Sequence, residues 1–169
     1  MSTPGLAARR GAAALVAGVL DRGLSLGEQA DAAGGPLAAL APAERARAQA
    51  LAAGTLRHLG RIDAVLAPFL RKPPPPAAMN ALRLAVAELN LDGVPAHAAV
   101  DGAVRLMGGG KARHLAGMVN AVARRVAGGG QALWEATPEA PLPDWLADPV
   151  AGAWGTDALA AIAGAHRRG

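Results

Sequence analysis

The chain has 169 residues and a formal net charge of +4, and apolar residues make up 52% of it, which is enough to form one core. It lacks cysteine, so disulfides, thiolate metal sites and cysteine nucleophiles are excluded. Tyr is also absent and Phe69 is the only phenylalanine, which argues against an all-β fold because strands favour aromatic residues.

Apolar residues recur with helical spacing in chain order. Seven helices are predicted: one over about residues 4–21, a short one that begins at residue 25, and five over about residues 42–59, 62–69, 79–90, 95–107 and 112–127. Pro73–Pro76 is expected to be a stiff spacer, and Gly128–Gly130 to end the seventh helix. Two short helices are predicted in the tail, over 145–150 and 156–165. We therefore predict an all-α bundle of about seven helices with a partly helical C-terminal tail.

The charges are divided unevenly between the two ends of the chain. Residues 1–127 hold 15 basic and 8 acidic side chains, whereas residues 128–169 hold 2 and 5. Arginine supplies 15 of the 17 cations, and its planar fork fits phosphates. A basic body and an acidic tail indicate two regions with different roles. We expect a domain over 1–127, a linker over 128–144 and the start of a following region over 145–169.

Other site types find little support in the sequence. His58, His97, His114 and His166 have no metal-ligand spacing, so no metal is expected. Gly108-Gly109-Gly110-Lys111 lacks the Ser or Thr that a phosphate loop needs, because Ala112 follows. No catalytic constellation is evident. Arg9-Arg10 before an apolar run resembles an export signal. No small-residue cleavage site adjoins this run, so we expect a cytoplasmic protein that does not contact a membrane.

The arginines are the best candidates for a binding surface, because grouped arginines neutralise several phosphates at once. Asn120 lies mid-helix, where Asn is a poor helix former, and we expect it to hydrogen-bond to a neighbouring loop or helix end. The predicted RNA-contacting residues are Arg9 and Arg10 on the first helix, Arg57 and Arg61 on or after the third, and Arg113, Arg124 and Arg125 on the seventh.

Residues 117–125, Gly-Met-Val-Asn-Ala-Val-Ala-Arg-Arg, resemble the Gly-Leu-Val-Asn-Ala-Val-Leu-Arg-Arg signature of NusB-like domains. Residues 94–100, 51–59 and 9–26 resemble three other family segments in the same order. The set is similar to the N-terminal domain of the Sun/Fmu ribosomal-RNA cytosine-C5 methyltransferases. Pro143-Asp144-Trp145-Leu146 and Ala153-Trp154-Gly155 resemble the pattern that opens the family's next region.

The resemblance implies an RNA-binding and docking domain that serves a catalytic domain using S-adenosylmethionine. That catalytic domain and its two motif cysteines are missing from this sequence, so the chain itself is expected to bind no cofactor and to catalyse nothing. Its expected partners are ribosomal RNA and the absent methyltransferase domain. The family's aromatic residue near Gly54 is also missing, so phosphate contacts are expected rather than base reading. A free-standing transcription antitermination factor and a purely structural module remain alternatives.

Overall fold

The structure is a computed structural model that describes residues 5–139 and 142–168, and within these residues it contains helices and no strand. The predicted all-α class is confirmed. The helices are α1 (Leu6–Arg22), α2 (Leu26–Asp31), α3 (Pro42–Arg57), α4 (Leu59–Leu66), α5 (Pro76–Asn90), α6 (Ala96–Leu106), α7 (Ala116–Ala136) and α8 (Asp144–Arg168), with 3-10 turns η1 (Ala67–Phe69) and η2 (Gly110–Leu115).

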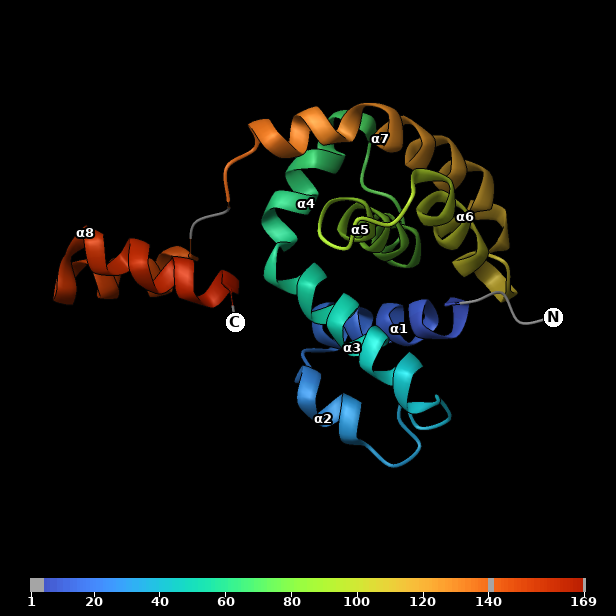
Figure 1. The fold of residues 1–169 in the computed structure, drawn as a ribbon, viewed down its shortest axis with the longest axis horizontal. Helices are drawn as coiled ribbons and strands as arrows, with labels where there is room; N and C mark the ends of the chain where they lie inside the picture. The colour runs from blue at the N-terminus through green and yellow to red at the C-terminus, as the bar shows by residue number, and fades with distance from the viewer. Residues whose placement is uncertain (1–4, 140–141, 169) are drawn as a thin grey trace.

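Helix α5 is the centre of the bundle, and Figure 1 shows it nearly end-on inside a ring formed by α1, α3, α4, α6 and α7. Nine of its 15 residues are buried, on every side of the helix. A helix that is apolar almost all round belongs in an interior, which explains this position. Pro75 and Pro76 start the helix, since proline suits a first turn, and Pro73 and Pro74 form the loop that leads into it.

Small residues let α1 lie very close to the elements beside it. A Cβ atom added to Gly11 would lie 2.7 Å from Leu37 Cδ2 and 3.2 Å from Ala48 Cβ. One added to Gly18 would overlap the amide of Gln29, which is buried beneath α1. Glycines of α1 therefore allow close backbone approach in a core that also buries large side chains such as Leu15 and Leu37.

A buried ion pair joins α1 to the central helix. Glu88 of α5 is 1% exposed, and Arg9 of α1 reaches it with Nε 2.9 Å from Oε2 and a terminal nitrogen 2.9 Å from Oε1. Arg47 of α3 adds a second cation 3.5 Å from Oε1. Gly102 of α6 leaves room for Arg9, because a Cβ there would lie 2.5 Å from Arg9 Nε.

Helix α7 continues past the point where the sequence predicted its end. It runs through Gly128–Gly130 to Ala136, and its α-helical part begins at Ala116 rather than Ala112. Gly130 is buried, and a Cβ there would lie 3.0 Å from Val126 Cγ1. Trp134 is 8% exposed and packs in the core, so its burial offsets the cost of about 1 kcal/mol that each glycine adds to a helix.

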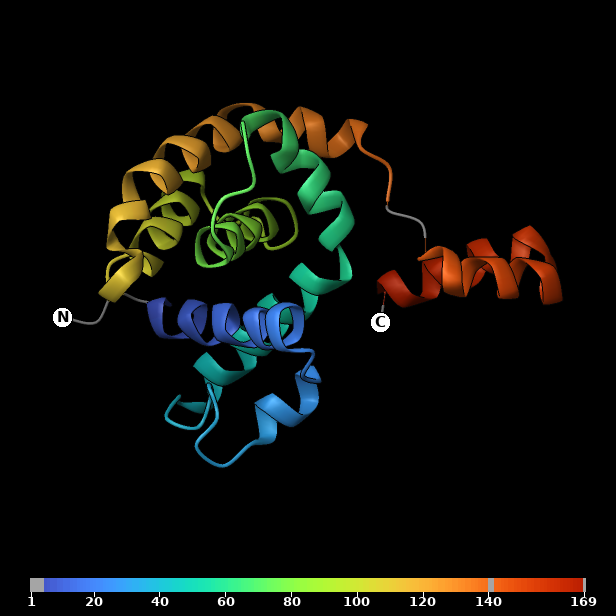
Figure 2. The ribbon, with the colours of Figure 1, turned by 180° about the vertical axis from the view of Figure 1, so that it is seen from behind.

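Helix α8 stands apart from the bundle in both views of the ribbon (Figures 1 and 2). Gly155 has φ 83° and ψ 169°, which interrupts the helix and leaves the two helical pieces that the sequence predicted. Val150 and Ala163 are buried but do not belong to the main core. Trp145 and Trp154 are 76% and 69% exposed, so the largest side chains of α8 face solvent.

Replacing Glu88 with Gln tests the buried ion pair. The change leaves the Arg9 charge buried without its counterion, so we expect the free energy of unfolding to fall by about 3–5 kcal/mol. Urea unfolding followed by circular dichroism measures the loss. Asp101→Asn is the matched control, because the pair of Asp101 with Arg105 is about half-exposed on both sides and is worth about 0.2–1 kcal/mol. Equal effects of the two substitutions would contradict the central role of Glu88.

Candidate nucleic-acid interface

Two of the seven arginines predicted to contact RNA are structural instead. Arg9 is 6% exposed and its guanidinium is occupied by Glu88, so it cannot reach a phosphate. Arg61 belongs to α4 rather than to α3, because the helix breaks at His58, where φ is −105° and ψ is 18°. The guanidinium of Arg61 lies 4.1 Å from the ring centroid of Trp134 and donates to the Trp134 carbonyl oxygen at 2.6 Å.

Glu139 completes a polar cluster that holds the chain after α7 against α4. One carboxylate oxygen accepts from Arg61 at 2.6 Å, and the other lies 3.2 Å from His58 Nδ1. Partial burial raises the pKa of Glu139, but the hydrogen bonds and charges of His58 and Arg61 outweigh it, so the pKa lies below its ordinary value. The cluster holds the C-terminal end of α7 against α4.

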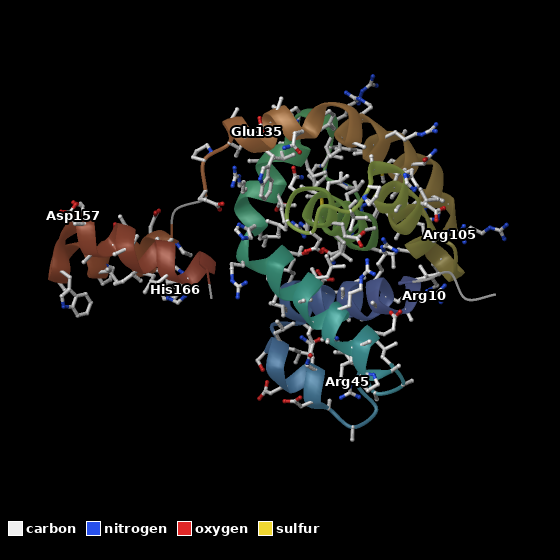
Figure 3. All side chains as sticks on the ribbon, in the orientation of Figure 1. Arg10, Arg45, Arg105, Glu135, Asp157 and His166 are labelled. Atoms are coloured by element: carbon white, nitrogen blue, oxygen red, sulfur yellow. The ribbon has the colours of Figure 1, made fainter. Side chains whose placement is uncertain are left out.

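The other five predicted residues are exposed: Arg10 on α1, Arg57 at the end of α3, Arg113 in η2, and Arg124 and Arg125 on α7. Figure 3 shows Arg10 and Arg105 at the same end of the bundle. Arg10 lines a hollow between α1, the start of α5 and the end of α6. These cations remain candidates, but they do not form one surface.

The neighbours Arg124 and Arg125 lie on opposite flanks of α7. Arg124 lines a groove of about 760 Å³ between α6 and α7, which we call the α6–α7 groove. Its other polar residues are His97, Asp101 and Asn120, and the rest of its lining is small or apolar. No described residue hydrogen-bonds to the Asn120 side chain, so the expected bond to a loop or helix end is not formed. Because Arg124 and Asp101 carry opposite charges, this groove has no marked net charge.

Arg125 lines a second groove, of about 580 Å³, which we call the proline-loop groove. The groove lies between α7 and the segment that links η1 to α5. It is lined by Phe69, Leu70, Arg71, Lys72, Pro73, Pro74, Pro75, Leu115, Met118, Val122 and Arg125. Three of these side chains are cationic and none is acidic. The sequence analysis did not predict Phe69, Arg71 or Lys72 as RNA-contacting residues.

A charge pattern in the sequence could have found these residues. Asp63 and Glu88 are consecutive carboxylates in the chain, and the 24 residues between them include Arg71, Lys72 and Arg83. Arg83 is partly buried, and its guanidinium donates two hydrogen bonds of 2.8 Å to the Asp63 carboxylate. Arg71 and Lys72 are therefore the exposed cations of this segment, and no carboxylate of the described residues pairs with them.

Two other features are absent from the described part of the chain. Within residues 5–139 and 142–168, no three His, Asp or Glu side chains lie together as a metal ion would need. Over the same ranges, no helix is both long and apolar enough to cross a membrane.

The NusB family pattern matches residues 6–128. The chain belongs to the NusB family. It is 35% identical over 160 residues to ribosomal RNA small subunit methyltransferase B of Xanthomonas campestris pv. campestris, an alignment that covers 92% of this chain and 36% of that protein. It is 40% identical over 127 residues to the protein of the same name from Thermus thermophilus, covering 69% and 29% respectively. The chain thus spans about a third of the length of these curated relatives.

The Glu139 cluster predicts a pH-dependent stability. A carboxylate whose pKa is lower in the folded state stabilises the fold above its unfolded pKa of about 4.3, and this stabilisation is lost as the pH falls through the folded value. We therefore expect Glu139→Gln to destabilise the chain at neutral pH and to have no effect in acid. Urea unfolding at pH values from about 7 to about 3 gives the difference.

Trp134 reports on this cluster directly, provided that the exposed tryptophans are removed. Trp145→Phe and Trp154→Phe in both proteins leave Trp134 as the single indole, because the chain has three tryptophans. The buried indole under Arg61 should become exposed together with the loss of helicity. A Glu139→Gln effect that is the same at neutral and acid pH would contradict the assignment.

Proposed function

We propose that this chain is the RNA-binding and docking part of a ribosomal-RNA cytosine-C5 methyltransferase that uses S-adenosylmethionine in the cytoplasm. In this proposal the chain holds ribosomal RNA in position for a methyltransferase domain that the sequence does not include. It binds no cofactor itself and supplies no catalytic group.

The extent of the similarity supports a methyltransferase rather than an antitermination factor. The alignment with the Xanthomonas protein covers 160 residues, whereas the NusB family pattern ends at residue 128. The similarity therefore continues into the region of α8. A free-standing antitermination factor is not expected to share that region, and no feature of the described structure favours it over the methyltransferase part.

The distribution of exposed cations carries the RNA-binding part of the proposal. Arg113, Arg124 and Arg125 are exposed, and no ion pair within the described residues involves them. They lie on η2 and α7, and Figure 1 shows α7 on the side of the bundle away from α2. Exposed arginines that form no ion pair with a carboxylate can bind phosphates directly. No ion pair has to break, and no buried side chain has to become exposed, before RNA binds.

The test is a titration of the chain with a structured ribosomal-RNA fragment at two salt concentrations. We expect a dissociation constant of about 1 μM or weaker that rises steeply with salt. Replacing Arg113, Arg124 and Arg125 with Ala should weaken binding and lower the salt slope by about 0.7–0.9 for each phosphate that the variant no longer neutralises. Fluorescence anisotropy of a labelled RNA measures both quantities.

Arg22→Ala is the matched control, because Arg22 is an exposed cation at the end of α1, beside α2. It should change neither the affinity nor the slope. If the RNA affinity does not depend on salt, or if Arg22→Ala weakens binding as much as the substitution of Arg113, Arg124 and Arg125 does, the assignment of RNA contacts to these three arginines is wrong.

A further inference from the structure

We infer that the proline-loop groove binds an unpaired stretch of RNA, with Phe69 stacking on a base and Arg71, Lys72 and Arg125 holding the adjoining phosphates. This inference rests on the proposed function, because it names the kind of RNA and the place where it binds. It also reverses the expectation of phosphate contacts alone, since it gives the domain a surface that recognises bases.

The groove has the size and composition of a site for nucleotides. Its volume of about 580 Å³ lies within the range of about 300–1,000 Å³ that is typical of small-molecule sites. The floor is apolar, with Leu115, Met118 and Val122 from η2 and α7. The cations stand on two separate elements, Arg125 on α7 and Arg71 and Lys72 on the loop opposite. A strand lying in the groove would meet positive charge from both walls.

Phe69 supplies the stacking surface. Its side chain is half-buried, and the Arg125 guanidinium carbon lies over the ring, 5.4 Å from the centroid, so a base can stack on this face only when Arg125 turns from the ring towards a phosphate. The other aromatic residue of the bundle, Trp134, is 8% exposed and covered by Arg61. Aromatic rings with nearby cations are the arrangement by which proteins hold single strands, because every base has a face that stacks.

The backbone keeps this surface rigid. Four prolines in a row follow Arg71 and Lys72 and restrict this loop and the start of α5, so little conformational freedom is lost on binding. Phe69 is supported from behind by α7, since a Cβ added to Gly129 would lie 3.9 Å from Phe69 Cζ. The extension of α7 through its glycines therefore places the helix beneath the ring.

The charges favour this groove over the α6–α7 groove as the RNA site. The α6–α7 groove contains Asp101, and Arg124 is its only arginine. The proline-loop groove contains three cations and no carboxylate. Within a duplex, bases are stacked on each other and hide their faces, so an apolar groove with an aromatic wall is better matched to an unpaired segment.

The experiment uses the whole 169-residue chain and two fluorescein-labelled RNAs of about ten nucleotides, one single-stranded of mixed sequence and one duplex. Phe69→Leu keeps an apolar side chain and removes the ring. We expect it to weaken single-strand binding about tenfold without a change in salt slope, and to leave duplex binding unchanged. Phe69→Trp should retain binding, and Trp154→Leu, which removes an exposed ring on α8, should have no effect.

A second variant tests the phosphate contacts. Arg71→Ala together with Lys72→Ala should lower the salt slope for the single strand by about 0.7 for each phosphate that is no longer neutralised. Circular dichroism of each variant verifies that the helices are retained. If Phe69→Leu and the double variant both leave single-strand affinity unchanged while substitutions of Arg113 and Arg124, which lie outside the groove, reduce it, the inference is wrong and the proposed function stands.

Two other outcomes also decide against the groove. If no RNA binds at any salt concentration, the proposed function fails and the inference fails with it. The groove could instead take an acidic peptide, and a synthetic peptide with the sequence of residues 142–156 represents that class. If the groove variants abolish binding of this peptide and leave RNA affinity unchanged, the groove is a protein-docking site.

Discussion

The carboxylate of Glu88 is the constraint on which the arrangement of the bundle depends. It lies on the mostly apolar central helix and is 1% exposed, and a charge in that position requires a partner. Arg9 supplies one from α1, and Arg47 approaches from α3. The guanidinium of Arg9 fits only because Gly102 of α6 has no side chain. One ion pair therefore relates four helices, and their register cannot change without leaving a charge buried alone.

Local sequence patterns predict the helices of this protein well, because an amphipathic α-helix buries one face and its apolar residues recur with a period of 3.6 residues. Ser25 caps α2, since its Oγ accepts from the Glu28 amide at 3.2 Å and donates to Glu28 Oε2 at 2.7 Å. The glycines of α7 misled the prediction because the signal that ends a helix is local, whereas the burial of Trp134 that continues it depends on α4.

The candidate site was harder to predict than the fold, because a sequence shows which residues are charged but not which charges meet. Arg9 and Arg124 look equivalent as surface arginines, yet only Arg9 faces a buried carboxylate contributed by a residue 79 positions away. Arg124 and Arg125 are adjacent, but successive residues of a helix point about 100° apart, which is enough to place them in different grooves.

The ion pairs of the interior also determine what the surface can do. Arg61 and Glu139 hold the end of α7 over α4, and α7 in turn supports Phe69 through Gly129 and carries Arg125 beside the ring. If the end of α7 were released, the wall of the proline-loop groove that carries Arg125 would move relative to the wall that carries Arg71 and Lys72. Arg9 and Arg61 thus hold in place the elements on which the exposed cations stand.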